Sequence, residues 1–275
     1  MIANAQHYKR VVADFFRDGV GAGGADTVAL AALVATNYQP HLAAFRSAPL
    51  LNPGIDVLRD RLRAAGPIAH RVVRLVADHD LVFAHVKYPG AAPLAGVDVF
   101  RIDDDGRIAE HWNVRQPLPP GGTQGEDRFT NSLEPPAAAT HDPAWLKKRL
   151  STMLAEFWAK GNASLVSEYY STRYIQHNAD MPGGYQRIKE IVETEIPKYI
   201  AVTGGPYPIS VHAMAAEHDI VCVYLSIFMA GINRHDGARS TNVDIFRVDA
   251  GGKMIEHWDV LEMDCETIAN AATLF

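Results

Sequence analysis

The sequence predicts an α+β protein with two tandem cone-shaped domains, each with N-terminal helices packed on a curved, mainly antiparallel sheet. Two observations carry this prediction. The string NVDIFRVDAGGKMIEHWDV at residues 242–260 nearly repeats GVDVFRIDDDGRIAEHWNV at residues 96–114. In each copy, apolar residues at helical spacing come first and strand-like segments joined by short turns follow, which is the order of an α+β domain.

Three further pairs of similar segments precede this repeat. They are residues 11–19 and 153–161, residues 37–43 and 173–179, and residues 77–87 and 216–226. All four pairs occur in the same order in both halves. We therefore infer a tandem duplication.

A segment without periodicity separates the two copies. Residues 116–143 are rich in Pro, Gly and small polar residues, which is typical of a linker. We expect a first domain at residues 1–125, a linker at 126–141 and a second domain at 142–275. Asp142 followed by Pro143 is a typical helix start, with an N-cap and a first-turn proline.

The second copy shows its predicted elements most clearly. Apolar residues recur at helical spacing from Trp145 to Trp158, and Gly161 predicts the end of that helix. Further helices are expected over residues 163–170 and 185–199, the latter interrupted by Pro197. Strands are expected at residues 207–215, 220–230, 242–248 and 253–262. Helices on one face of such a sheet leave an open end that suits a small molecule.

Composition excludes several classes of function. The 275 residues are 48% hydrophobic, carry a formal net charge of -6 and show no basic stripe, which argues against a nucleic-acid partner. No apolar run approaches the roughly 20 residues of a membrane span, and the first residues lack a signal-peptide layout. We expect a cytoplasmic protein with a small hydrophobic molecule as its partner. No motif indicates a cofactor or metal, and Cys222 and Cys265 are expected to stay reduced.

The segments YIQHN, NVDIFRV, a Gly turn and KMIEHWDV resemble the SnoaL-like polyketide cyclase family of the nuclear-transport-factor-2-like superfamily. The nearest resemblance is to its predicted aldol-condensation group, whose ending is similar to residues 270–275. The resemblance implies cofactor-independent chemistry by a carboxylate in a largely apolar pocket, which matches Asp259. It also implies that cones pair through their sheets. We expect an intrachain pseudo-dimer here, and a further homodimer is open.

Strand alternation selects the candidate site. His257 and Asp259 share one face of their strand, and we predict that this face lines the second cone. The predicted catalytic residues are Asp259, His257 and His177. The predicted substrate-binding residues are Tyr174, Ile245, Val243 and Trp258. The opposite assignment would instead place Asp244 and Trp258 inside.

The two copies differ at the candidate site. Asn113 replaces Asp259 in the first copy, and Leu42 replaces Asn178. An amide cannot take a proton near neutral pH. We therefore predict that the second domain holds the working site and that the first is degenerate.

Three functions fit this sequence. The first is a cofactor-independent acid–base enzyme, a cyclase, aldol-type lyase or isomerase, acting on a small apolar carbonyl compound. The second is a non-catalytic module for small-molecule binding or pairing. The third is epoxide hydrolysis, which needs an Asp–Arg–Asp set. It ranks last because Asp244 and Arg247 are three residues apart, on opposite strand faces.

Overall fold

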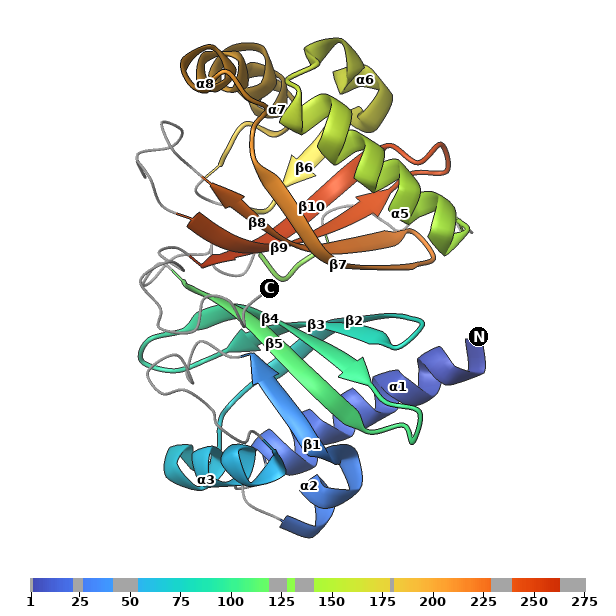
Figure 1. Cartoon of the computed structure of the whole chain (residues 1–275), viewed down its shortest axis with the longest axis vertical. Coiled ribbons are helices and arrows are strands. Elements are labelled where there is room, and N and C mark those ends of the chain that lie inside the picture. The colour runs from blue at the N-terminus through green and yellow to red at the C-terminus, as the bar shows by residue number, and fades with distance from the viewer. Residues whose placement is uncertain are drawn as a thin grey trace. The chain divides into compact units, whose positions relative to one another are not determined.

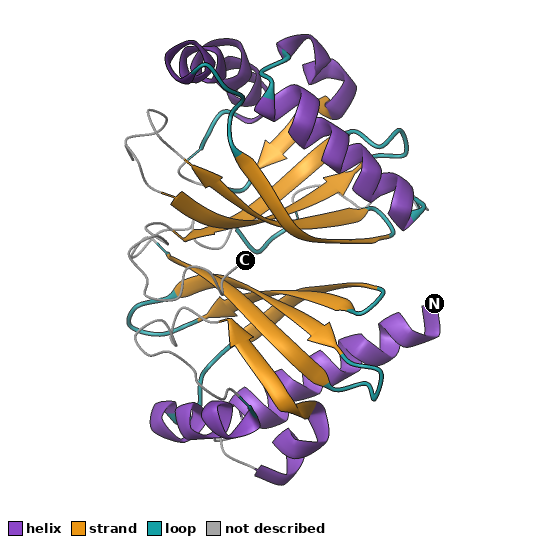
Figure 2. Cartoon of the chain, in the orientation of Figure 1, coloured by secondary structure: helices purple, strands orange, loops and turns teal. Residues whose placement is uncertain are grey.

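The chain contains two compact α+β units, coloured along the sequence in Figure 1. The computed structural model describes residues 2–21, 27–41, 54–118, 128–131, 141–178, 181–228 and 239–262. The described residues of the first unit lie within Met1–Pro120, and those of the second lie within Gly121–Glu266. Each has a five-stranded sheet with helices over one face (Figure 2), so the predicted fold class is confirmed. Pairing of the units stays a prediction.

The first unit places two helices before its first strand. Its helical elements are α1 (Ile2–Asp14), a π-helical segment (Phe15–Gly21), α2 (Thr27–Leu33) and α3 (Ile55–Ala65). Its strands are β1 (Val34–His41), β2 (Arg71–Asp78), β3 (Leu81–Tyr88), β4 (Leu94–Ile102) and β5 (Ile108–Pro117). The sheet order is β1-β5-β4-β3-β2, and only β1 and β5 pair in parallel.

The second unit repeats this topology. Its helical elements are α5 (Pro143–Thr152), a π-helical segment (Met153–Ala159), a 3₁₀ turn (Ala163–Leu165), α6 (Val166–Tyr169), α7 (Gly184–Glu190), a second π-helical segment (Ile191–Glu195) and α8 (Ile196–Thr203). Its strands are β6 (Tyr170–Gln176), β7 (Ile209–Glu217), β8 (Ile220–Phe228), β9 (Arg239–Val248) and β10 (Met254–Glu262). The order β6-β10-β9-β8-β7 matches that of the first sheet, as a duplication predicts.

Local signals explain the helix ends of the second unit. The Asp142 carboxylate accepts the Trp145 backbone N–H at 2.8 Å, and Pro143 occupies the first turn of α5. Gly161, at φ 67°, follows the helix in the left-handed region. Pro197 lies within a continuous helical run, in which α7, the π-helical segment and α8 follow one another directly. The regular α-helical pattern is interrupted by the π-helical segment just before Pro197, which has no N–H to donate.

The segment after the short helix α6 is a strand, which the sequence analysis did not predict. The predicted helix at residues 163–170 ends at Tyr169, and β6 begins at Tyr170. Aromatic and β-branched residues such as Tyr174 and Ile175 favour this extended conformation. β6 pairs in parallel with β10, which brings residues distant in sequence side by side.

The helices of the second unit bury an apolar core against the sheet. Leu150, Met153 and Phe157 are fully buried and belong to one cluster with Val221 and Val223 of β8. Figure 1 shows α5 lying across that sheet. The core therefore fixes the sheet face that the helices cover, which is the face that carries the candidate site.

The remaining sequence-based predictions concern single residues and membrane spans. Leu42, Cys265 and residues 270–275 lie outside the described residues. Cys222 is buried in β8. In the part of the chain that the structure describes, every helix is too short or too polar to cross a membrane.

Candidate acid–base site

A β-bulge in β10 decides which side chains face the helices. The pairing of β10 with β9 shifts by one residue between Met254 and Glu256, so that Asp259 lies opposite Asp244. Residues directly opposite each other on antiparallel strands share a face. Asp244 therefore joins His257 and Asp259 on the helix-covered face.

Three residues predicted to bind substrate lie on the other face. Ile245 pairs with Trp258, and Val243 pairs with Val260, so none of them lines the cavity. The prediction that Val243, Ile245 and Trp258 bind substrate is therefore wrong. For Val243 and Ile245 the prediction assumed an unbulged hairpin, in which Val243 would lie opposite Asp259. Trp258 alternates with His257 and Asp259 along β10 and so faces the other side in either register.

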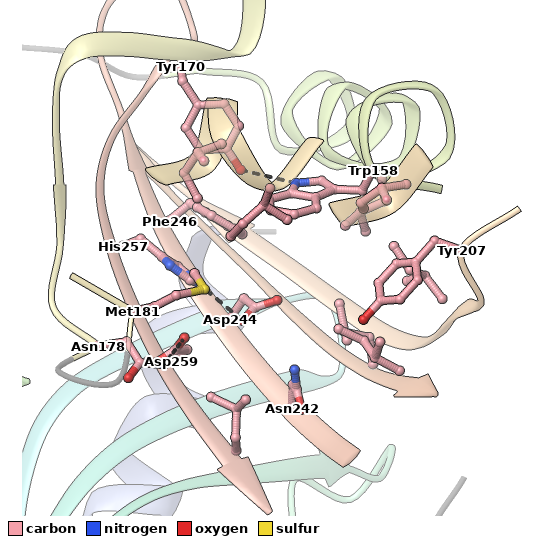
Figure 3. A pocket seen from close by; sticks show the side chains of 18 of the residues that line it. Trp158, Tyr170, Asn178, Met181, Tyr207, Asn242, Asp244, Phe246, His257 and Asp259 are labelled. Carbon is pink, nitrogen blue, oxygen red and sulfur yellow. Dashed lines mark hydrogen bonds and ion pairs between the residues drawn. The ribbon is translucent and has the colours of Figure 1, made fainter. Parts of the chain in front are cut away.

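The helix-covered face ends in a mainly apolar cavity of about 130 Å³ (Figure 3). Most of its wall consists of aliphatic and aromatic side chains, including Leu154, Trp158, Ile188, Ile191, Ile196 and Leu225. Tyr174, His257 and Asp259 line it, and so do Asp244, Asn178 and Asn242. The polar side chains come from β9, β10 and the end of β6, so they gather at the sheet side of the cavity.

His257 is held by hydrogen bonds on both ring nitrogens. Its Nδ1 lies 2.9 Å from Gln176 Nε2, and its Nε2 lies 3.3 Å from Asp244 Oδ1. The ring stacks on Phe246 at a centroid distance of 4.3 Å. Burial alone would lower the pKa of His257, but the hydrogen bond to Asp244 and the charges of Asp259 and Asp244 raise it.

Asp259 is buried and linked to a cation through Asn178. Asn178 Nδ2 donates to Asp259 Oδ2 at 2.9 Å, and Arg128 donates to Asn178 Oδ1 at 3.1 Å. Arg128 also lies 3.9 Å from Asp259 Oδ1. Burial raises the pKa of Asp259 and the charge of Asp244 adds to it, whereas His257, Asn178 and Arg128 oppose the rise.

His177 lies away from the cavity, which corrects the prediction that it reaches into it. Its Nε2 lies 3.0 Å from Glu256 Oε1, and its ring stacks on Trp258 at 5.0 Å. Glu256 also accepts from Arg247. β6 turns His177 to the sheet face opposite His257, because neighbouring residues alternate along a strand.

The first unit repeats this His–Glu–Arg–Trp cluster. His41 lies 3.1 Å from Glu110, which also accepts from Arg101. The His41 ring stacks on Trp112 at 4.6 Å. A cluster retained in both copies, including the copy that lacks the carboxylate at Asn113, fits a structural role for His177.

In the first unit, the carboxylate that remains at the matched site is fully hydrogen-bonded. Asp98, the counterpart of Asp244, accepts two bonds from Arg115, one from Tyr88 and one from His111. Burial would raise the pKa of Asp98, but Arg115 and His111 hold it well below its usual range. This carboxylate is a fixed anion and is not available as a base.

Three differences between the copies accompany the hydrogen bonding of Asp98. A Cβ on Gly96 would lie 2.5 Å from Arg115 Nη1 and 2.8 Å from Tyr88 Cε2, so this glycine makes room for both side chains. The counterparts of Gly96, Arg115 and Tyr88 in the second unit are Asn242, Leu261 and Ile227, and all three line the cavity.

Sequence reasoning missed Arg128, Gln176 and the role of Asn178. Arg128 lies in the predicted linker, yet its side chain is 2% exposed and belongs to the second unit. No periodic pattern in the sequence indicates that Arg128 packs into the second unit. Recognition of β6 as a strand beside β10 would have placed Gln176 next to His257 and Asn178 next to Asp259.

Asp244, His257 and Asp259 are also a candidate metal-binding set, with ligand atoms within 4.8 Å of one another. Their hydrogen bonds do not fit that role. Gln176 donates to His257 Nδ1, which leaves the hydrogen on Nε2, the nitrogen beside Asp244. A metal needs a lone pair there. The prediction of no metal stays a prediction.

Known proteins resemble the chain in structure only. No family model and no curated protein matches the sequence. IdmH, a putative polyketide cyclase from Streptomyces antibioticus, is 20% identical over 40% of this chain and 91% of its own, with a TM-score of 0.32. TsrD from Streptomyces laurentii is 18% identical over 48% and 98%, with a TM-score of 0.35. A steroid delta-isomerase from Pseudomonas aeruginosa is 14% identical over 52% and 90%, with a TM-score of 0.30. Likenesses this distant carry no conclusion about activity.

Proposed function

We propose that the second unit is a cofactor-independent acid–base enzyme acting on a small apolar carbonyl compound. One observation carries the proposal: Asp244, His257 and Asp259 lie together at the wall of a mainly apolar cavity. Buried ionisable groups lower the stability of a fold unless they are paired and hydrogen-bonded. A cleft with perturbed titratable groups is therefore a candidate for proton-transfer chemistry.

In this reaction Asp259 is the general base. Its carboxylate removes a proton from the carbon next to the carbonyl, and the C–H electron pair forms the enolate double bond. His257 Nε2–H donates a hydrogen bond to the enolate oxygen. Burial raises the pKa of Asp259, which makes its ionised form a stronger base.

The enolate can react in two ways that both fit the cavity. If the substrate has a C=C bond beside the reacting carbon, the resulting dienolate can take the proton back from Asp259 at the far carbon of that bond, which is an isomerisation. Alternatively, its carbon attacks a second carbonyl of the same molecule, and Asp259 returns its proton to the new alkoxide. Both routes move one proton and balance without an oxidant or a reductant.

The cavity favours a compact substrate. Its volume is about 130 Å³, close to the roughly 150 Å³ of an apolar protein cavity that holds benzene. The described walls therefore suit a compound with one ring or a short chain. Epoxide hydrolysis by Asp244 with Arg247 finds no support, because Arg247 bonds to Glu256 on the opposite face.

The proposal can be tested without the natural substrate. Small cyclic ketones are incubated with the protein in D₂O, and deuterium uptake next to the carbonyl is followed by NMR. Asp259→Asn should slow catalysed exchange by about 10²–10⁴-fold, the usual contribution of a general base. The control is Asp105→Asn on an exposed turn, where the side chain is 74% exposed. Ketones that bind without exchange above buffer would favour the binding module.

A further inference from the structure

We propose that Gln176 is a positioning residue that holds His257 in its neutral tautomer with the hydrogen on Nε2. The hydrogen-bond directions carry this proposal by themselves. Its catalytic consequence rests on the proposed function, in which that hydrogen is offered to the substrate oxygen.

The orientation of the Gln176 amide follows from the backbone. The Asn178 backbone N–H lies 3.0 Å from Gln176 Oε1, and a backbone N–H can only donate. The oxygen of Gln176 is therefore the group that faces Asn178. Its NH₂ group must face the other way, toward His257.

The tautomer of His257 follows from the amide. Gln176 Nε2 lies 2.9 Å from His257 Nδ1, and an amide NH₂ can only donate. Nδ1 must then present its lone pair, so the neutral ring carries its hydrogen on Nε2. A second proton on Nδ1 would point at the NH₂ group.

The neighbouring side chains hold the His257 ring in this orientation. Gln176 is the direct strand partner of His257, because β6 and β10 pair in parallel. Phe246 stacks on the ring at an interplanar angle of 9°, and the Tyr174 ring lies 6.4 Å away. The charged groups that face His257 are Asp244 on β9 and Asp259 on β10. Its Nε2–H therefore points at the carboxylate side of the cavity.

In the first unit, the strand partner of the matched histidine is not an amide. Pro40 is the strand partner of His111, and Tyr38 Oη lies 3.0 Å from His111 Nδ1. A hydroxyl can donate or accept, so it does not select a tautomer. Asp98 instead fixes the hydrogen of His111 on Nε2, because its carboxylate accepts from that nitrogen at 2.8 Å. An amide that acts from the Nδ1 side is a feature of the copy that carries Asp259.

The test uses NMR of the full chain with ¹⁵N-labelled histidine, and a His257→Gln variant assigns the signals. Above the raised pKa of His257, where the ring is neutral, we expect its hydrogen on Nε2. Gln176→Glu should keep the bond to the Asn178 N–H but accept from Nδ1, so His257 should stay doubly protonated to higher pH. Gln176→Met should release the ring into a mixture of tautomers. His111 should be unchanged in every variant.

A wild-type His257 whose neutral ring carries its hydrogen on Nδ1 overturns the proposal, and so do variants that leave the His257 signals unchanged at every pH. In ketone exchange, Gln176→Met should lower the rate by up to about 10⁴-fold, the size known for a catalytic histidine in the wrong tautomer. The NMR result needs no activity. Failure of wild-type exchange therefore counts against the proposed function alone.

Discussion

Replacing Glu256 by Gln should destabilise the second unit much more than Glu110→Gln destabilises the first. The two glutamates have matched partners: Glu256 bonds to His177 and Arg247, and Glu110 bonds to His41 and Arg101. Their surroundings differ. The side chain of Glu256 is 0% exposed, whereas that of Glu110 is 30% exposed.

The magnitude follows from this difference in burial. Removing one partner of a buried ion pair costs about 3–5 kcal/mol, because the remaining charge stays buried. Gln still accepts a hydrogen bond, so about 3 kcal/mol is expected for Glu256→Gln. Glu110 has a partner, Arg101, that is 41% exposed, and a solvent-screened pair contributes less than about 1 kcal/mol.

The assay must report each unit separately. Hydrogen exchange in increasing urea, read by mass spectrometry, distinguishes peptides of β9 and β10 from those of β4 and β5. At a urea slope of about 2 kcal/mol/M, Glu256→Gln should lower the midpoint of the second unit by about 1.5 M. Each variant serves as the control for the other.

Equal losses in the two units would refute the argument that burial sets the energy of this cluster. The same variants test the role of His177. If His177 were catalytic, Glu256→Gln would slow ketone exchange even when all of the protein is folded. We expect the exchange rate per folded molecule to stay within about threefold, because a lost acid–base group would cost about 10² or more.

Three further predictions address the cavity. Burial raises the pKa of Asp259. The folded state therefore binds the proton of this carboxyl group more tightly than the unfolded chain does. The stability that this protonation contributes is present below about pH 4 and is lost as the pH rises through the raised pKa. Asp259→Asn should remove that loss and stabilise the second unit at neutral pH in urea titrations, and parallel curves for variant and wild type would contradict this. Zn²⁺, Mn²⁺ and chelators should leave thermal unfolding unchanged, and a saturable stabilisation lost in Asp244→Asn would show a metal site instead. The triple variant Asn242→Gly, Leu261→Arg and Ile227→Tyr should fill the cavity and abolish ketone binding by NMR without loss of circular dichroism; retained binding would show that these three positions do not control access.

The repeat predicts the fold well because it is a property of the whole chain. Two copies with the same order of helical and alternating segments must form two similar sheets, and both sheets have the same strand order. Strand β6 was not predicted from the sequence, because it is short and pairs with β10, which is distant in sequence. Its aromatic and β-branched residues favour a strand, but nothing near it in the sequence indicates that β10 is its partner.

The site depends on one backbone irregularity that the sequence does not announce. The bulge after Met254 reverses which β9 residues share a face with Asp259, and the first unit has the same shift between Arg101 and Ile102. Periodicity located His257 and Asp259 relative to each other, because they lie on one strand beyond the bulge. It misplaced Val243, because that relation crosses the bulge.

The duplication also changes how mutations act on the two sites. In an assembly of identical chains, every codon change appears in each copy, so no position can serve packing in one subunit and proton transfer in another. Here Asn113 and Asp259 are separate codons. One half can collect the changes that secure a fold, such as Arg115 beside Asp98, while the other keeps buried acids that weaken it. The compromise between stability and activity that a single site must make is divided between two stretches of one gene.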